Sequence, residues 1–265
     1  MWRNLARLVR HRGLIQSLVA RELTARYRGS VLGFFWSFVN PLLLLLIYAF
    51  VFGVLLPNRA VEPYGLFLFC GILPWTWFSA SLLESSGSLV AGGNLIKRVL
   101  FPAEVLPIVS VLANMVHFFF GFLVLAAFLV GFQHLPDWSG LPWLPVVVTI
   151  QLVLTLGLAL LLSALTVHFR DVRDLLANFL TLAFWATPIV YPWTFEGLRD
   201  QAWFQWVLRL NPFAQLVIAY QELLFFDGPF GRLPGLAVTG VVALVVLLAG
   251  YWVFDRLRDS FAEAV

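Results

Sequence analysis

The chain has 265 residues, of which 61% are hydrophobic and only 12% are charged, and its mean hydropathy is +0.90. Soluble domains are about half apolar and about a quarter charged, so this composition excludes an ordinary soluble protein and predicts one embedded in lipid. The single cysteine, Cys70, excludes an internal disulfide. The net charge of +3 comes from basic residues placed to orient membrane segments, and it indicates no nucleic-acid partner.

Residues 1–30 form a basic segment that precedes the first apolar run. Its apolar residues recur at helical spacing, with arginines on another face, at Trp2, Leu5, Leu8, Val9, Leu14, Ile15, Leu18 and Val19. This pattern predicts an amphipathic helix that lies in the cytoplasmic membrane interface and is interrupted near Gly13. A basic anchor that only fixes topology is the alternative interpretation.

Six uncharged apolar runs follow, each of about 18 residues or more, close to the length that a helix needs to cross a bilayer. They are 31–56, 66–83, 105–132, 143–167, 175–193 and 234–254. Lipid leaves each backbone polar group to be satisfied within its own segment, and the runs lack the alternation of a β-barrel, so helices are predicted. The fold class expected is an all-α integral membrane protein with six transmembrane helices, five of them within 31–193.

The segment 194–233, between spans five and six, is apolar but interrupted. Arg209, Asn211 and Pro212 divide the run 203–226 into two pieces that are each too short to cross the membrane. Asn211 followed by Pro212 is typical of a helix start, with the asparagine as N-cap and the proline in the first turn. We therefore expect two short re-entrant helices on the outer side. A seventh span is the alternative, and it would place the C-terminal tail outside.

The basic residues predict the orientation of the chain. Seven arginines precede residue 31. The others that a cytoplasmic N-terminus places on the same side are Lys97, Arg98, Arg170, Arg173, Arg256 and Arg258. Thirteen of the 17 basic residues are then cytoplasmic, as the positive-inside rule requires, and so is the tail 255–265. A cleaved signal peptide is disfavoured because the first apolar run is too long and ends in Leu-Leu-Pro.

The sequence lacks the residues of common transport chemistries. A P-loop for ATP requires Gly-Lys-Ser/Thr, whereas the only lysine, Lys97, is followed by arginine. The six predicted spans contain no Asp or Glu that could relay protons, and Glu84 lies just past the second span. His117 is the one titratable side chain well inside a span, and a lone histidine there is more typical of helix packing. An ion-coupled carrier is therefore disfavoured.

A membrane enzyme is the rival class. Metal-dependent glycosyl or phosphoryl transfer needs clustered carboxylates or histidines at a span mouth, and the sequence has no Asp-x-Asp and no paired histidines. The nearest cluster is HFRDVRD, at 168–174, which is equally well interpreted as a salt-bridged inner loop. No metal site and no cofactor of its own are predicted for the chain.

Aromatic residues are abundant, with 11 Trp, 6 Tyr and 26 Phe. Interfacial belts account for some of them. Others cluster beside prolines, in FFW at 34–36, PWTWF at 74–78 and FWATPIVY at 184–191. Aromatic planes with polar edges suit a carbohydrate chain in a wet channel, while packing or a belt position is the alternative for each of these residues.

Five motifs occur in order over nearly the whole chain. They are RELTARYRGSVLGFFWSFVNPLLLLLIYAFVFG at 21–53, NLIKRVLFPAEVLP at 94–107, FRDV at 169–172, FWATPIVYP at 184–192 and LNPFAQLVIAYQELLF at 210–225. Together they resemble the permease subunits of type-2 ABC exporters that move O-antigen, teichoic acid and related lipid-linked polysaccharides. Capsule-exporting relatives carry a glutamate before the proline of the first span, so Asn40-Pro41 favours the O-antigen or teichoic branch.

This resemblance implies a homodimer of six-span subunits in the bacterial cytoplasmic membrane, each a single transmembrane domain over 1–265. It also implies two copies of a separate ATPase subunit, which hold the ATP and Mg²⁺, and a polyprenyl-linked polysaccharide as cargo. The loop at about 88–102 would dock on the ATPase, and its Gly92-Gly93 turn, Asn94 cap and short apolar face agree with that role. An ordinary interfacial helix is the alternative. The coupling residues expected are Asn94, Leu95, Ile96, Lys97, Arg98, Phe101 and Pro102.

The Asn40-Pro41 pair is unusual in a membrane helix. Pro41 removes a backbone hydrogen bond and predicts a kink, while Asn40 offers its side chain to the freed groups or to the neighbouring subunit. Thr187-Pro188 is expected to repeat this device in span five, so that kinked spans widen one end of a dimer channel. The channel and gate residues expected are Phe34, Phe35, Trp36, Asn40, Pro41, Trp75, Trp77, Phe184, Trp185, Pro188, Tyr191, Asn211 and Pro212. A packing kink without a gating role is the alternative.

Arg21, Arg26 and Arg28 precede the first span at headgroup depth, where a polyprenyl pyrophosphate would present its charges. Arginine can grip phosphate oxygens bidentately, so these three are predicted to bind the lipid pyrophosphate, with topological anchoring as the alternative. Three other functions stay open for the whole chain. They are an ABC permease for another amphiphile such as a drug or lipo-oligosaccharide, a membrane-embedded glycosyl or acyl transferase, and a passive scaffold.

Overall fold

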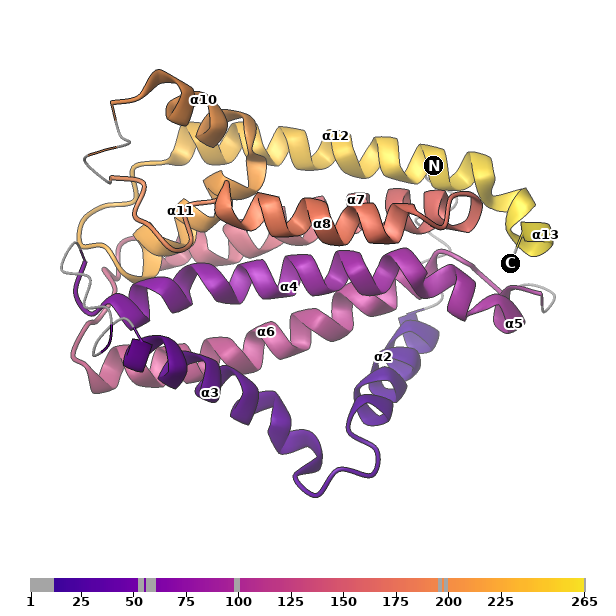
Figure 1. Cartoon of the computed structure of the whole chain (residues 1–265), viewed down its shortest axis with the longest axis horizontal. Helices are drawn as coiled ribbons and strands as arrows, with labels where there is room; N and C mark the ends of the chain where they lie inside the picture. The colour runs from indigo at the N-terminus through magenta and orange to yellow at the C-terminus, as the bar shows by residue number, and fades with distance from the viewer. Residues whose placement is uncertain are drawn as a thin grey trace.

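A computed structural model describes residues 12–51, 55, 61–97, 101–194, 197 and 200–264 (Figure 1). Over these residues all regular secondary structure is helical, and the longer helices lie side by side as a bundle. This confirms the predicted all-α fold class. The predicted positions Trp2, Leu5, Leu8, Val9 and Arg98 lie outside the described residues, and so does the side chain of Phe34.

Within the described residues, four helices are long and apolar enough to cross a bilayer. They are α4 (Tyr64–Ala91), α6 (Val105–Gly131), α7 (Leu144–His168) and α12 (Leu233–Leu257). Two more, α3 (Trp36–Phe50) and α8 (Val172–Trp185), have 15 and 14 residues where the structure describes them. At about 1.5 Å per residue these two reach roughly 22 and 21 Å, less than the roughly 30 Å of a hydrocarbon core. Each predicted span therefore contains a helix, and over the described residues four of the six have spanning length.

The two ends of the bundle differ. One, which we name the α5 end, holds α5 (Gly93–Ile96) and α13 (Phe261–Ala264) (Figure 1). The other, the α11 end, holds α10 (Ala202–Leu210) and α11 (Pro212–Leu224). Short 3-10 turns complete the chain at η1 (Gly33–Phe35), η3 (Leu141–Trp143) and η4 (Arg258–Ser260). The described basic residues of the predicted inner loops lie at the α5 end, because they flank α5, the start of α8 and the end of α12.

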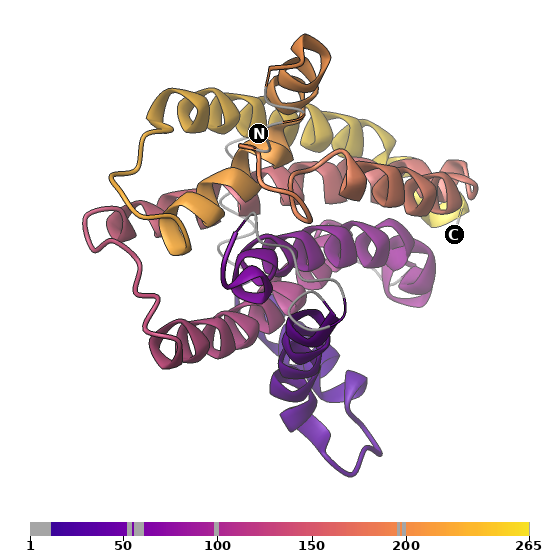
Figure 2. The ribbon, with the colours of Figure 1, turned by 60° about the vertical axis from the view of Figure 1, so that its left-hand side comes forward.

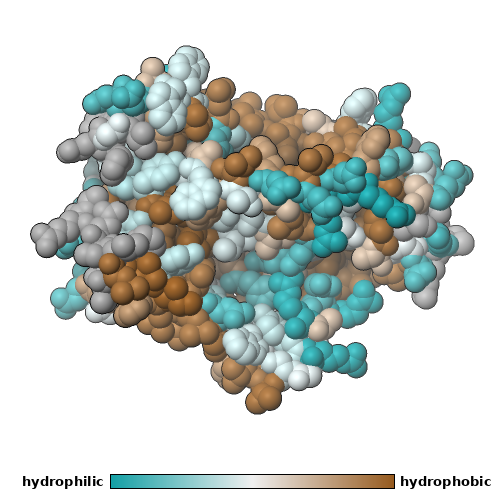
Figure 3. Space-filling model, viewed as in Figure 1, coloured by the Kyte–Doolittle hydropathy of each residue, from teal (hydrophilic) through white to brown (hydrophobic). Residues whose placement is uncertain are grey.

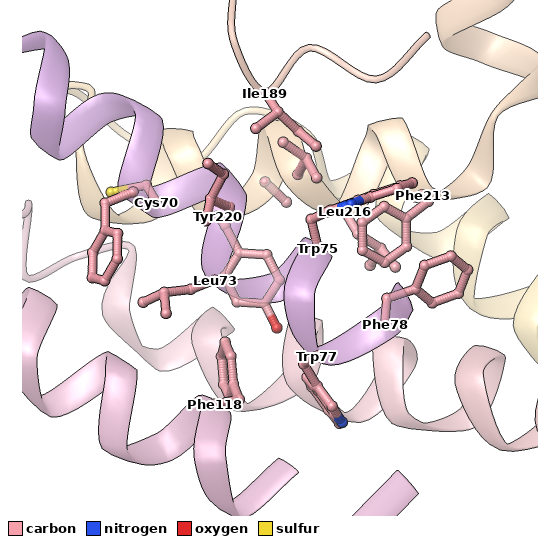
Figure 4. Packing of buried hydrophobic residues seen from close by; sticks show 14 of the residues in the cluster. Cys70, Leu73, Trp75, Trp77, Phe78, Phe118, Ile189, Phe213, Leu216 and Tyr220 are labelled. Atoms are coloured by element: carbon pink, nitrogen blue, oxygen red, sulfur yellow. The ribbon is translucent and has the colours of Figure 1, made fainter. Parts of the chain in front are cut away.

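Aromatic side chains of α4, α6 and α11 form the core (Figure 4). Phe78 stacks on Phe213 with ring centroids 4.2 Å apart, and Trp75 meets Phe213 edge-on at 5.4 Å. Trp77 packs on Phe118 at 5.0 Å. Because α11 contributes much of this core, the short helices near the α11 end are part of the bundle rather than a loose cap.

α7 and α12 approach each other more closely than ordinary side chains allow. A β-carbon added to Gly250 would lie 2.1 Å from the carbonyl oxygen of Gly157, and one added to Gly157 would lie 2.6 Å from the backbone of Leu247. Small residues permit such contact between membrane helices. These glycines therefore set the distance between the two helices.

α2 (Arg12–Arg26) lies against the start of α6. Its Leu18 is buried with Val105 and Val109, and Leu14, Ile15 and Val19 pack around them. The predicted apolar face of this helix is thus confirmed over its described part. In Figures 1 and 2 α2 and α3 both project from the bundle and leave an open angle between them.

Candidate functional site

A cleft of about 760 Å³, which we name the α3 cleft, opens between α2, α3, α4 and α6. Its side toward α2 is polar, with Arg26, Tyr27, Ser37, Asn114 and His117. Its side along α3 is aliphatic, with Leu43, Leu44, Ile47 and Leu73. This volume lies within the range of about 300–1,000 Å³ that ligand pockets occupy. A cleft with a charge on one side and branched aliphatic side chains on the other fits an amphiphile.

An ion pair links α2 to α4 across the polar side of the α3 cleft. Nη2 of Arg26 donates to both carboxylate oxygens of Glu84, at 2.9 and 2.8 Å, and Nη1 donates to Oδ1 of Asn114 at 3.1 Å. Nδ2 of Asn114 donates in turn to Oε2 of Glu84 at 2.6 Å. Glu84 lies inside α4, which continues to Ala91, so the helix extends beyond the predicted second span. Serine and glycine are weak helix formers, so packing extends the helix here, where Ser85, Ser86 and Leu89 are buried in the bundle.

Tyr27, Ser37 and His117 form a second polar contact in the α3 cleft. The Ser37 hydroxyl donates to the Tyr27 hydroxyl at 3.1 Å, and that hydroxyl lies 3.3 Å from Nδ1 of His117. The contact joins the turn after α2 and the start of α3 to the middle of α6. His117 therefore connects helices, in agreement with the packing role predicted for it.

Other charged side chains pair at the two ends of the bundle. Glu222 pairs with Arg232 at the α11 end, where the Arg232 guanidinium also lies 4.1 Å from the ring centroid of Trp193. Arg258 pairs with the buried Glu104 at the α5 end. Within the part of the chain that the structure describes, no group of three His, Cys, Asp or Glu side chains could hold a metal ion.

A second cleft, of about 410 Å³, lies between α2, α4, α6 and the start of α8, and we name it the α2 cleft. Arg21, Glu84 and Arg173 bring charge to its wall, and Leu95 of α5 lines it as well. The Arg173 guanidinium lies over Gly87, where an added β-carbon would be 3.6 Å from Nη1. Within the described residues neither Arg21 nor Arg173 forms an ion pair.

The three arginines predicted to bind lipid pyrophosphate have different surroundings. Arg26 is paired with Glu84, and its side chain is 28% exposed. Arg21 is exposed and lines the α2 cleft. Arg28 lies in the turn after α2 and lines neither cleft. They do not form one set of three unpaired cations, because Arg26 already has a carboxylate partner.

The predicted coupling loop folds partly as expected. α5 is a single turn whose N-cap residue is Gly92, so the prediction of Asn94 as the cap is wrong. Gly92 takes that position without a side-chain hydrogen bond, and Asn94 falls inside the turn. Asn94 and Lys97 are exposed, whereas Ile96 packs against a buried cluster that includes Phe261.

The remaining coupling residues contact the bundle. Leu95 lines the α2 cleft, and Phe101 packs on the α2–α6 contact around Leu18. Pro102 accepts the backbone hydrogen bond of Val105 in the turn before α6. Of the six predicted coupling residues that the structure describes, the two exposed ones therefore offer the most accessible surface to a partner.

Two of the predicted channel aromatics are buried. Trp75 and Trp77 are 7% and 2% exposed. They have too little free ring surface to stack on a sugar, which corrects the prediction that they line a channel. Their positions on α4, the most buried of the four candidate spans, explain the difference. Phe35 and Trp185 are 71% and 61% exposed and keep free ring faces.

Trp36 and Phe184 lie between these extremes. The indole N–H of Trp36 donates to the Ser30 hydroxyl at 2.8 Å at the edge of the α3 cleft. Phe184 is half-buried and meets Trp75 edge-on at 5.7 Å. The side chains of Trp36 and Phe184 can both move to new contacts at a small cost in free energy, since neighbouring residues do not enclose either ring completely.

The two Pro-containing pairs differ in their effect on the chain. α3 continues through Pro41, and Asn40 is exposed in the α3 cleft without a hydrogen bond to any described residue. α8, in contrast, ends at Trp185, so the prediction that Pro188 kinks a span is wrong. Proline disfavours helical backbone in the residue before it, and here the helix stops short of Thr187.

α11 begins as predicted. Oδ1 of Asn211 accepts from the backbone N–H groups of Phe213 and Ala214 at 3.0 and 3.2 Å, with Pro212 in the first turn. Nδ2 of Asn211 also donates to the Thr187 hydroxyl at 3.1 Å. Asn211 therefore ties α11 to the segment that follows α8.

Three further contacts hold the same segment. Gln221 of α11 donates to the carbonyl oxygen of Pro188 at 2.8 Å, and the Tyr191 hydroxyl donates to the carbonyl oxygen of Trp185 at 2.8 Å. The Tyr64 hydroxyl of α4 donates to the carbonyl oxygen of Val190. The turn after α8 is thus fixed by side chains, and the predicted gate residue Tyr191 has a structural role there.

Polar residues on α8 were not identified from the sequence. Asn178 and Thr181 are exposed, and Asn178 has no hydrogen-bond partner among the described residues. Hydrophilic side chains gather over α8 and the space between α4 and α2 in Figure 3. An unpaired amide facing lipid is costly, so this face suits water or protein. The available signal was an Asn and a Thr three residues apart inside an otherwise apolar run.

Comparison with known proteins agrees with this architecture. Residues 13–225 match the family described as ABC-2 type transporter. The chain is 37% identical to the O-antigen export system permease protein RfbA of Myxococcus xanthus over 265 residues, which is 100% of both chains. It is 32% and 31% identical to two proteins of the same name from Klebsiella pneumoniae, over 94% of each chain.

The matched family region contains α2, both clefts and α11. Its apolar helices are those of a multi-pass membrane protein, and the family is one of transport subunits rather than enzymes. The resemblance noted in the sequence motifs is thereby confirmed. The chain belongs to the ABC-2 type transporter family.

Proposed function

We propose that the chain is the permease subunit of an ABC exporter that moves O-antigen-type polysaccharide, carried on a polyprenyl pyrophosphate, across the bacterial cytoplasmic membrane. The observation that carries this proposal is the 37% identity, over the full length of both chains, to a permease named for O-antigen export. All three relatives carry that name, which favours O-antigen over teichoic acid.

Two copies of the chain form the channel in this proposal. Each contributes six spans, with α3 and α8 as the short ones, and α10 and α11 as re-entrant helices on the outer side. The exposed amides of Asn40 and Asn178 support this arrangement, because both lack partners within the described chain. A second copy or a water-filled channel supplies them. The basic residues at the α5 end support a cytoplasmic location for both termini.

The lipid part of the cargo fits the α3 cleft. Aliphatic side chains along α3, including Leu43 and Ile47, suit a prenyl chain, and the polar side of the cleft faces α2. The polysaccharide itself is too large for this cleft and passes between the two copies. Exposed rings such as Phe35 and Trp185 offer surfaces on which sugars can stack.

Energy comes from a separate ATPase subunit that docks at the α5 end, two copies to the dimer. The chain has no Gly-Lys-Ser/Thr motif, so ATP and Mg²⁺ belong to that partner. Asn94 and Lys97 are exposed on α5 and form the contact. Ile96 is excluded from it because Ile96 packs inside the bundle.

Export can be tested directly in a cell that lacks the gene. Loss of this chain should remove O-antigen from the cell surface while lipid-linked polysaccharide accumulates inside, and the gene supplied in trans should restore export. Surface polysaccharide and the inner lipid-linked pool are measured by immunoblotting. Normal surface polysaccharide without the chain would contradict the proposal. The purified chain alone should neither bind nor hydrolyse ATP.

Docking can be tested at Lys97. Lys97→Glu reverses an exposed charge and should reduce co-purification of the ATPase without changing the unfolding temperature, because rim charges act on association. Lys97→Arg is the matched control and should retain the partner. Ile96→Asp should instead destabilise the chain, since it buries a charge. Undiminished co-purification with Lys97→Glu would place the contact elsewhere.

A further inference from the structure

We propose that the α2 cleft binds the diphosphate head of the lipid carrier between Arg21 of α2 and Arg173 at the start of α8. This inference rests on the proposed function and sharpens it. It places the head between two elements that are far apart in the sequence. It also gives a role to Arg173, which belongs to the loop interpreted from sequence as a salt-bridged turn.

The charges of the α2 cleft favour an anion. Within the described residues Arg26 and Glu84 satisfy each other, so Glu84 does not neutralise the other two arginines. Among the residues that line the cleft, Arg21 and Arg173 then face a single further carboxylate, that of Glu22, whereas Asp171 and Asp174, beside Arg173 in the sequence, do not line it. One positive charge is left over. Guanidinium groups recognise phosphate through paired N–H donors, and a diphosphate offers oxygens to both arginines.

Gly87 shapes the site. The Arg173 guanidinium lies against α4 at Gly87, at 3.6 to 4.0 Å from where a β-carbon would be. Any larger residue there would push the guanidinium toward solvent. The volume of about 410 Å³ is at the small end of ligand pockets, which suits a head group and the first prenyl unit rather than a polymer.

The position of the cleft favours a lipid over a soluble anion. One wall is α2, whose apolar face and terminal arginines are typical of a helix at headgroup depth. The α3 cleft adjoins it, because Arg26 lines one cleft and its partner Glu84 lines the other. A head in the α2 cleft therefore lies next to the aliphatic side chains of α3.

The same cleft reaches the proposed docking segment. Leu95 of α5 lines it, one residue from Asn94 and two from Lys97. A diphosphate bound in the α2 cleft would therefore lie next to α5, whose neighbouring exposed residues Asn94 and Lys97 are proposed to contact the ATPase. Loading of the lipid can change the position of α5 without any contact between substrate and nucleotide.

The test is binding of farnesyl diphosphate to the complex of permease and ATPase in phosphatidylcholine nanodiscs, measured by isothermal titration calorimetry. Arg21→Lys and Arg173→Lys keep the charge but lose the two-pronged donor, so each should weaken binding about tenfold, the value of one charge-assisted hydrogen bond. Arg170→Lys is the matched control, because this exposed arginine lines neither cleft. It should bind as the wild type does.

Competing ligands distinguish the sources of the diphosphate. Inorganic diphosphate should bind more weakly than farnesyl diphosphate, and phosphatidylglycerol should not compete. If inorganic diphosphate bound as tightly as farnesyl diphosphate and lost affinity in the same two variants, the result would still support a diphosphate site. That site would recognise the head group alone. Competition by phosphatidylglycerol at equal affinity would overturn the proposal in favour of a general anionic-lipid surface.

Other outcomes also overturn the site. They are wild-type affinity in Arg173→Lys, or no binding by the wild-type complex. Loss of the ATPase from Arg173→Lys with farnesyl diphosphate binding intact would assign Arg173 to the partner protein. These results are separable from the proposed function, because the assay contains no polysaccharide. Surface O-antigen that persists without the chain contradicts the function, whereas unchanged binding in the variants contradicts only the site.

Discussion

Two pairs of helices in this bundle are held in opposite ways. α7 and α12 meet backbone to backbone at Gly157 and Gly250. α3 and α8 each bury only two residues and expose aliphatic, aromatic and a few polar side chains. Buried contact holds the first pair to the scaffold, whereas the second pair is attached by few contacts. Local opening costs least where buried contacts are few, so the elements that bear the candidate sites are also those able to move.

The contrast shows where each kind of residue is useful. Glycine in α12 removes side chains so that two helices can meet, and it leaves no room for change at that point. Asn40 in α3 and Asn178 in α8 each leave a side-chain amide without a hydrogen-bond partner among the described residues of one copy. Such an amide favours an interaction of its helix with another molecule. A transport subunit needs both helices that stay fixed, as α7 and α12 do, and helices that can move and bind other molecules, as α3 and α8 can.

The largest expected effect on stability is at the contact between α7 and α12, which we call the frame. Gly250→Leu should destabilise the chain by about 3 kcal/mol or more, at the upper end of overpacking, because the added carbon meets the backbone of Gly157 rather than a movable side chain. Thermal unfolding of detergent-solubilised protein measures this. Gly240→Ala on the same helix is the control, since its β-carbon would lie 3.4 Å from a side-chain carbon of Ile150. If Gly250→Leu and the wild type had equal unfolding temperatures, α7 and α12 would not be held together by the close approach of their backbones.

A smaller effect is expected where the frame meets the moving pair. Asn211→Ala removes both the N-cap of α11 and the bond to Thr187, and it should cost about 1–3 kcal/mol. Asn211→Ser keeps a capping oxygen but lacks the amide donor, so it should recover roughly the cap's share of about 1 kcal/mol. Denaturant unfolding compares the two variants. If they were equally unstable, the link from α11 to the turn after α8 would dominate over the cap.

Much of the frame could be predicted from the sequence. Apolar runs without charge indicate helices by length alone, and every predicted span contains one. The cap at Asn211 was also predictable, because capping depends on adjacent residues. The end of α4 was not, since Glu84 suggested a boundary that a long-range ion pair with Arg26 makes unnecessary. Local pattern contains no information about a partner 58 positions away.

The candidate site was less predictable for the same reason. Arg21, Arg26 and Arg28 are neighbours in sequence, but folding gives them three different surroundings. Arg173 reaches the α2 cleft only because α8 returns along α4, where Gly87 leaves space. Aromatic motifs suggested channel surface, yet burial assigned Trp75 and Trp77 to the core. A motif indicates which residue types are present, while packing decides which of them are accessible.

The smallest effect on stability, and the sharpest test of the comparison, is expected at Asn178. If α8 faced lipid, Asn178→Leu would stabilise the single chain and leave export unchanged, because an exposed amide in lipid is unfavourable. If α8 faces a second copy or a wet channel, the same variant should leave the unfolding temperature nearly unchanged. It should then weaken dimer association by the free energy of one interhelical hydrogen bond, about 0.6–1.7 kcal/mol, or reduce export.

Asn178→Gln retains the amide and serves as the control for polarity. Val241→Leu, on the exposed face of α12, serves as the control for apolar surface, and it should change neither property. Dimer affinity in nanodiscs and surface polysaccharide in cells are both measured, because a channel role affects only the second. Full export and unaltered dimer affinity in Asn178→Leu would place α8 against lipid, and the helix would then belong with the frame.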